Sequence, residues 1–430
     1  MTTALLKQDK QSSWIGLTVV VSLLATTGFM LAIEVLFESG IAQFIAAGNT
    51  NYDATNIILD KLYGLSISKW VSIQVVTNAF TAVVIGLITF ELVGKYHFQG
   101  AILAALTPTI FLWTNGQNGE TPLLFFGSLG VYFILRYLKV PGWKYGMLSG
   151  LCLGLALLTR GTLVAFPFIG TLTLFGIFVL SRNFSIVRAS GAAVLPFILC
   201  FVIVGLPVAK NYQSTGYVFW SAEGGKHLLD WVYPCLTNKY GCGIRDLDLV
   251  ARGKREYAEA KAALPSDMQE NVGAQHRLRN QMAQKRIADL DVLPLAGAIV
   301  AAYIKQLTYT SLRTVFARME WPQGSALNYY VRPNPKYQYN VLAMVAITMI
   351  ECINVLLRLV QSIGLVSLLR NRAKLESGIL VFAYFIAAIA SGIGIGHPRY
   401  RSATEVVLVP LTILGLVAIK QFMDSRTAKT

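Results

Sequence analysis

The chain has 430 residues and a formal net charge of +15; 54% of its residues are hydrophobic and only 14% are charged. This composition excludes an ordinary soluble domain, in which about 25% of residues are charged. The positive charge does not indicate a nucleic-acid ligand, because much of it lies in short loops between apolar runs, as in membrane proteins.

Apolar runs long enough to cross about 30 Å of hydrocarbon follow one another along nearly the whole chain. They predict about ten transmembrane helices, at residues 14–32, 71–93, 98–113, 121–137, 145–158, 163–180, 189–208, 341–369, 378–395 and 406–422. The first run is interpreted as a retained helix, because it is long and no clear small-residue cleavage site follows it. The expected fold is therefore an all-α polytopic membrane protein.

The positions of Lys and Arg predict the orientation, because cytoplasmic loops keep the positive charge. With the N-terminus inside, one face collects Lys7, Lys10, Lys95, Arg136, Lys139, Lys144, Arg182, Arg188, Arg370, Arg372, Lys374, Lys420, Arg426 and Lys429. We expect both termini to be cytoplasmic and the protein to lie in a plasma membrane, such as the inner membrane of a bacterium. Part of the charge is expected to attract anionic membrane lipids.

The predicted spans divide the chain into three parts. Residues 1–209 form an N-terminal transmembrane module with a first outer loop at 35–70, residues 210–340 a small extracytoplasmic domain, and residues 341–430 the C-terminal transmembrane helices. In the outer domain, residues 252–291 are predicted to be surface helix broken near Pro265. Residues 293–316 are expected to form an interfacial helix, because a further crossing would turn the basic 370–374 cluster outward.

The five cysteines fall into two groups. Cys152, Cys200 and Cys352 lie in apolar spans and are predicted to be small packing residues. Cys235 and Cys242 lie close together in the outer domain, where an oxidising compartment permits a disulfide. Zinc is the weaker alternative for this pair, since no second pair of ligands has a suitable spacing.

Three arginines occur at outer helix ends, where basic residues are disfavoured. Arg160 ends the fifth span, and Arg399 and Arg401 flank Tyr400 between the last two spans. Any one of them can be explained by snorkelling or by pairing with a carboxylate. Together they favour an anion site, because the guanidinium fork matches a phosphate group.

Carboxylates occur on the same predicted face. Glu34 ends the first span, where the helix macrodipole disfavours negative charge, and Glu38 follows one turn later. Glu120 opens the fourth span, where the macrodipole alone would explain an acid. Asp53 lies in the first outer loop. Glu34, Glu38 and Asp53 could ligate Mg²⁺ or Mn²⁺ if they converge, but no cofactor is predicted with certainty and we do not expect a metal.

In their order along the chain, these residues resemble the GT-C membrane glycosyltransferases, particularly the branch with lipid A aminoarabinose transferase and protein O-mannosyltransferases. The first matching element begins at an acidic residue and has intervals of four, four, three and three residues, which Glu34, Glu38, Ala42, Ile45 and Gly48 occupy. The others are Asn118-Gly119-Glu120, Leu157-Leu158-Thr159-Arg160, the segment from Pro207 to Tyr212, and Arg399-Tyr400-Arg401 followed by Glu405. Glu34 stands where the family has Asp, Glu38 where it has an aromatic residue, and Lys210 where it has Arg. Both Glu34 and Glu38 therefore stay candidates for the base.

The resemblance implies a polyprenyl-phosphate-sugar donor and an extracytoplasmic lipid, glycan or protein acceptor, with direct displacement and inversion at the anomeric carbon. In this interpretation Glu34 or Glu38 is the catalytic base. The donor phosphate is held by Arg160, Lys210, Arg399 and Arg401. Asp53, Glu120 and Tyr400 are further candidates for the substrate site.

Three other functions compete with this one. A transporter or flippase for a lipid-linked or anionic solute would favour internal repeats and charges near the midplane. An oligosaccharide ligase or polymerase would also use outer arginines, but would not need an acid after the first span. A noncatalytic scaffold is the third. Clustering of the polar residues at one surface favours interfacial chemistry.

Two further observations leave alternatives open. His227 in the outer domain is interpreted as a surface histidine, with a sugar contact as the alternative. Glu351 and Arg358 fall two turns apart within the eighth span. A charge in such a place is costly, so either a pairing or a contact with a lipid phosphate is expected.

Overall fold

The computed structural model describes residues 14–25, 67–111, 119–140, 142–237, 247–309, 341–390 and 401–427. Within these ranges every regular element is a helix. Seven of the described helices are long and apolar enough to cross a membrane, or up to eight if one bent pair counts as a single span. The prediction of an all-α polytopic membrane protein is confirmed, while the orientation in the membrane stays a prediction.

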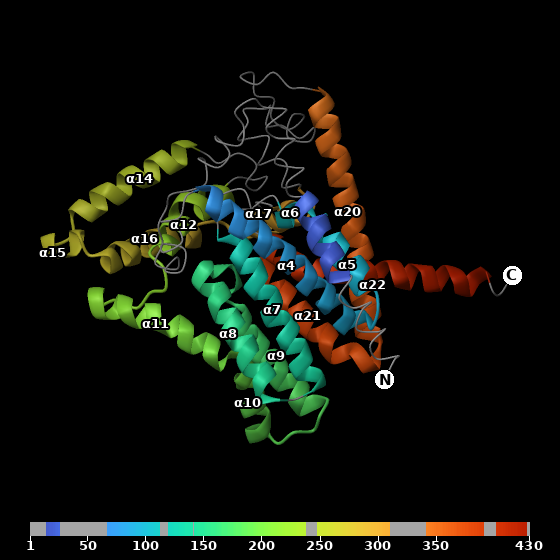
Figure 1. The fold of residues 1–430 in the computed structure, drawn as a ribbon. Helices are drawn as coiled ribbons and strands as arrows, with labels where there is room; N and C mark the ends of the chain where they lie inside the picture. The colour runs from blue at the N-terminus through green and yellow to red at the C-terminus, as the bar shows by residue number, and fades with distance from the viewer. Residues whose placement is uncertain are drawn as a thin grey trace.

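The described helices follow one another in the order of the chain (Figure 1). They are Trp14–Ala25, α4 Ile67–Val93, α5 His97–Ala105, α6 Pro108–Phe111, α7 Glu120–Lys139, α8 Trp143–Thr159, η3 Gly161–Leu163, α9 Phe166–Leu180, α10 Ile186–Val194, η4 Leu195–Phe197, α11 Ile198–Thr215, α12 Glu223–His227, η5 Leu228–Val232, α13 Tyr233–Leu236, α14 Leu247–Ala262, α15 Ser266–Gln269, α16 Val272–Ala288, α17 Val292–Thr308, α20 Val341–Arg370, η6 Arg372–Lys374, α21 Leu375–Ala390 and α22 Ser402–Thr427.

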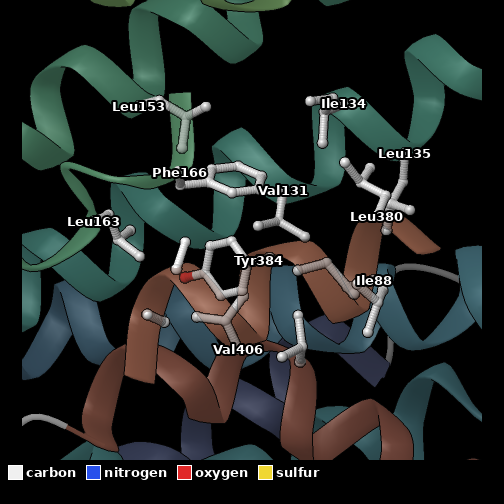
Figure 2. Close-up of a cluster of buried hydrophobic side chains, with 14 of the residues drawn as sticks. Ile88, Val131, Ile134, Leu135, Leu153, Leu163, Phe166, Leu380, Tyr384 and Val406 are labelled. Carbon is white, nitrogen blue, oxygen red and sulfur yellow. The ribbon is translucent and has the colours of Figure 1, made fainter. Parts of the chain in front are cut away.

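One continuous apolar core joins α4, α7, α8, α9, α21 and α22. Tyr384 of α21 is buried in this core, with its ring edge-to-face against Phe166 of α9 at 4.9 Å (Figure 2). Its hydroxyl donates to the carbonyl of Ala403 in α22 at 3.0 Å. A buried tyrosine hydroxyl usually needs such a partner. Through its ring contact and its hydrogen bond, Tyr384 joins α21 to both α9 and α22.

Helices α20 and α22 cross at a pair of glycines. A Cβ atom on Gly364 would lie 2.2 Å from the carbonyl oxygen of Leu411, and one on Gly415 would lie 2.0 Å from that of Val360. Small residues allow membrane helices to approach in this way. Beside the crossing, the Gln361 side chain donates to the Thr412 hydroxyl at 2.9 Å.

Charged residues from loops predicted to be cytoplasmic meet at one end of the bundle. Lys139 of α7 pairs with the buried Glu91 of α4 at 2.9 Å. Arg182, just after α9, pairs with Glu376 of α21 at 2.6 Å and also donates to the carbonyl of Leu138. The fold therefore gathers basic residues of several loops at the same end, as their assignment to one face requires.

The helices α12 to α17 form the described part of the predicted outer domain, and α14 to α16 lie to one side of the bundle (Figure 1). Val232 of η5 and Leu236 of α13 pack against Ala298 of α17 in a small core of their own. The predicted break near Pro265 is confirmed, since α14 ends at Ala262 and α15 begins at Ser266. Cys235 is buried and disulfide-bonded.

Two predicted membrane segments differ in detail. Residues 98–113 do not form one described span, because α5 has only nine residues, about 14 Å, and the chain turns before Pro108 opens the short α6. Proline lacks the N–H that a continuing helix needs and disfavours helix at the preceding residue. The apolar segment after residue 291 forms α17, which is bent by 112° from α16. Its placement at the membrane interface stays a prediction.

Candidate active site

The sequence-predicted site residues divide between described and undescribed parts of the chain. Both candidate bases, Glu34 and Glu38, lie outside the described residues, and so do Asp53, Arg399, Tyr400 and the cysteine Cys242. The structure does place Glu120, Arg160, Lys210 and Arg401. In the described part of the chain no three His, Cys, Asp or Glu side chains are arranged to hold a metal ion.

Glu120 and Arg160 form an ion pair between the ends of two neighbouring helices. Glu120 is the first residue of α7, where the helix macrodipole favours a negative charge, and its side chain is 1% exposed. Arg160 is the C-cap of α8, where a positive charge is favoured, and its side chain is 22% exposed. The pair therefore holds a partly accessible guanidinium over a buried carboxylate.

Polar groups of α4 lie next to this pair. The hydroxyl of Thr121, which follows Glu120, donates to the buried side chain of Gln74 at 3.1 Å. Asn78 lies one turn further along α4 and is 1% exposed, and its amide has no hydrogen-bond partner in the structure as described. Gln74 and Asn78 are not among the residues predicted for the site, although an amide within an apolar span is a signal that the sequence offers.

His227 is a titratable neighbour of Arg160 that the sequence pattern did not place at the site. It ends α12 and is half-buried, not a freely exposed surface residue. Burial and the nearby positive charge of Arg160 lower the pKa of His227 to about 4. The imidazole is therefore neutral at neutral pH, when it can donate at one ring nitrogen and accept at the other. Arg160 therefore lies near enough for its charge to act on the imidazole, and Trp220 of the preceding turn packs against the core of the bundle.

Lys210 is exposed on α11, and its neighbour Asn211 has a structural role. The Asn211 amide donates to the carbonyls of Phe219 and Trp220 at 3.0 and 3.1 Å. These bonds hold the turn that leads from α11 into α12. The family-like segment from Pro207 to Tyr212 therefore shapes the entry to the outer domain, and phosphate binding by Lys210 stays a prediction.

Arg401 is deeply buried beside a second acid, with its side chain 3% exposed and its Nε atom 3.0 Å from Glu405. Arg358 of α20 approaches the same carboxylate at 3.5 Å. For Arg358 either a pairing or a contact with a lipid phosphate was expected, and the structure pairs it with Glu405, a partner that was not predicted. Burial lowers the pKa of Arg401 to about 10, so its guanidinium remains charged at neutral pH.

The part of the chain that supplies Glu120 and Arg160 has a recognisable sequence. Residues 58–210 match the model of the dolichyl-phosphate-mannose-protein mannosyltransferase family. This match confirms the resemblance to the GT-C membrane glycosyltransferases. It covers α4 to α10 and most of α11, and it ends at Lys210.

Among solved structures, the chain is similar to the archaeal oligosaccharyltransferase AglB from Archaeoglobus fulgidus in complex with an inhibitory peptide and a dolichol-phosphate. The two share 15% sequence identity with a TM-score of 0.41. The similarity covers 83% of this chain and 40% of the archaeal chain, so this chain spans less than half of that protein. No curated protein matches the sequence.

Proposed function

We propose that the chain is a membrane glycosyltransferase that moves a sugar from a polyprenyl-phosphate-linked donor to an extracytoplasmic lipid, glycan or protein acceptor. The family match over residues 58–210 carries the proposal, because it includes the helices whose ends supply the Glu120–Arg160 pair. We place the termini in the cytoplasm and the reaction at the outer surface of the plasma membrane, on the strength of the charge pattern.

In the proposed reaction, Glu34 or Glu38 takes the proton of an acceptor hydroxyl. The hydroxyl oxygen attacks the anomeric carbon, the bond from that carbon to the phosphate oxygen breaks, and the phosphate leaves with the bonding electrons. This single displacement inverts the anomeric carbon. General-base catalysis typically contributes about 10²–10⁴ in rate.

Arg160, Lys210 and Arg399 are proposed to bind the leaving phosphate, where fixed positive charge is most effective as negative charge develops. For Arg160 the proposal is supported by its partial exposure and by the buried Glu120 that holds it. Glu120 is then a positioning residue, since its carboxylate is too buried to meet substrate directly. The contacts of Arg401 favour a different role, which is argued below.

The experiment is transfer from a panel of radiolabelled polyprenyl-phosphate sugars into cell-envelope acceptors, using membranes with matched amounts of protein. The variants are Glu34→Gln, Glu38→Gln and Arg160→Gln, with Arg426→Gln in the exposed end of α22 as the matched control. Loss of the base is expected to reduce transfer by about 10²-fold or more in one Glu variant. Arg160→Gln is expected to reduce transfer as well, and Arg426→Gln to leave it unchanged.

The other outcomes separate the competing functions. Full transfer in all three site variants would refute the proposed site. Transfer that depends on Arg160 but on neither acid would favour an oligosaccharide ligase. Movement of the lipid donor across reconstituted vesicles, with no sugar transfer from any donor, would favour a transporter.

A further inference from the structure

The carbonyl end of α17 is held by arginines from two other helices. The last carbonyls of a helix have no partner within it and must find one elsewhere. The carbonyl of Leu307 accepts from Arg401 at 2.8 Å and from Arg358 at 3.2 Å, and that of Tyr309 accepts from Arg401 at 2.9 Å. Positive charge at a helix C-terminus also matches the macrodipole.

Two more side chains complete this arrangement. The Asn354 amide of α20 donates to the carbonyl of Thr308 at 3.0 Å. Glu405 lies between the two arginines, 3.0 Å from Arg401 and 3.5 Å from Arg358, and is 4% exposed. Its single negative charge and the partial negative charge at the end of α17 offset most of the positive charge of the two guanidinium groups. We call Asn354, Arg358, Arg401 and Glu405 the α17 clamp.

The hydrogen-bonding groups of Arg401 are directed at the protein itself. One terminal nitrogen donates to two carbonyls of the α17 end, and the other donates to the Thr109 hydroxyl of α6 at 2.9 Å. The Nε atom faces Glu405. To bind a phosphate, Arg401 would have to give up these bonds in a place where water does not replace them. Its geometry suits positioning better than ligand binding.

The clamp is connected to the candidate site through α17. The N-terminal half of this helix packs, through Ala298, on Val232 of η5. The element η5 begins directly after His227, which feels the charge of Arg160. A shift of α17 would therefore be transmitted to η5 and to His227, which directly precedes it.

We infer that Arg401 is a positioning residue, which acts with the rest of the α17 clamp to seat the outer domain on the membrane bundle above the Glu120–Arg160 pair. The consequence for sugar transfer rests on the proposed function. The seating itself does not, and it can be measured without any substrate.

The first experiment measures the position of α17 by pulsed electron paramagnetic resonance. Spin labels are placed at Ile304→Cys in α17 and Leu416→Cys in α22, which are 56% and 52% exposed, in a Cys352→Ser background because Cys352 is also exposed. Arg401→Gln is expected to shift or broaden the distance distribution. Arg426→Gln, which changes the same residue type at the free end of α22, is expected to leave it unchanged.

Two gentler variants guard against a general loss of folding. Asn354→Leu removes the hydrogen bond from the clamp to the Thr308 carbonyl, and Thr109→Val removes the hydroxyl that accepts from Arg401. Both variants leave every charge in place. Asn354→Leu is expected to shift the distribution in the same direction as Arg401→Gln, by less. An unchanged distribution in both Arg401→Gln and Asn354→Leu would overturn the inference, whether or not the chain proves to be a transferase.

The second experiment separates positioning from phosphate binding, and uses radiolabelled polyprenyl phosphate as the probe. Arg401→Gln is expected to keep the dissociation constant within about twofold of the parent while kcat falls about tenfold or more. Arg401→Lys is not expected to restore kcat, because an ammonium group cannot reproduce the guanidinium fork. Asn354→Leu is expected to lower kcat as well.

Two results would contradict this account. A dissociation constant for polyprenyl phosphate raised about tenfold in Arg401→Gln and recovered in Arg401→Lys would make Arg401 a phosphate ligand. Unchanged kcat per folded molecule in both Arg401→Gln and Asn354→Leu would reduce the clamp to a purely stabilising contact.

Discussion

The crossing of α20 and α22 allows the effect of one methyl group to be worked out. In Gly415→Ala the new Cβ would lie 2.0 Å from the Val360 carbonyl oxygen, whereas ordinary contact begins at 3.4 Å. The two helices must therefore separate by about 1.4 Å, the difference of these distances. The neighbouring hydrogen bond from Gln361 to Thr412, now 2.9 Å, cannot survive a separation of that size.

The expected loss of stability follows from three contributions. Overpacking costs about 1–3 kcal/mol. Leaving the amide nitrogen of the buried Gln361 side chain unpaired costs about 1–3 kcal/mol more, while the Thr412 hydroxyl keeps its hydrogen bond to the Leu408 carbonyl. Alanine returns about 0.5–1 kcal/mol through its better helix propensity. We expect Gly415→Ala to lower the free energy of unfolding by about 1–5 kcal/mol, and the α17 clamp on the same two helices to be disturbed with it.

The assay is reversible unfolding in mixed detergent micelles, followed by tryptophan fluorescence. Gly205→Ala in α11 is the matched control, because a Cβ on Gly205 meets no atom within 4 Å. It is expected to leave stability unchanged or to raise it by up to about 1 kcal/mol. If Gly415→Ala is as stable as Gly205→Ala, the helices do not cross at these glycines and the reasoning fails.

Three further predictions concern the side of the protein that is predicted to face outward. Arg160→Gln is expected to lower the free energy of unfolding by about 3–5 kcal/mol, since it removes the ion pair of a buried Glu120 carboxylate, and adding Glu120→Gln should recover most of the loss in thermal unfolding. His227 takes up a proton near pH 6.5 when unfolded but only near pH 4 when folded. Stability should therefore fall as the pH drops through this window, by at most about 3 kcal/mol, and the melting temperature of His227→Gln should fall less between pH 7 and 5. Non-reducing mass spectrometry is expected to find a peptide that joins Cys235 to Cys242, and a different partner for Cys235 would contradict the predicted pairing.

Local signals predicted the helix ends that build the candidate site. The polar run before Glu120 and the acid itself placed the start of α7, and the structure begins that helix at the same residue. Likewise, Arg160 was expected to close its span and is the C-cap of α8. Helix ends carry their own chemistry of caps and dipoles, which is why they can be read from sequence.

Side-chain contacts between helices that are far apart in the sequence could not be predicted from such local signals. For Arg358 the sequence left open a pairing or a contact with a lipid phosphate, and in the structure it approaches Glu405 of α22. The choice depends on the close crossing at Gly364 and Gly415, which brings the two backbones together. His227 was misjudged for a related reason, since its helix α12 packs against α16, which lies about 50 residues further along the chain.

Arg160 and Arg401 show why residue type and position alone do not assign a role. Both were expected at outer helix ends, yet the side chain of Arg160 is 22% exposed and that of Arg401 3% exposed. A buried charge is tolerated only when its partners are numerous and fixed, and those partners then occupy the groups that a ligand would need. A partly exposed charge held from one side keeps another side for a ligand. We therefore expect the two arginines to have different roles, with Arg160 binding phosphate and Arg401 holding the protein around the site.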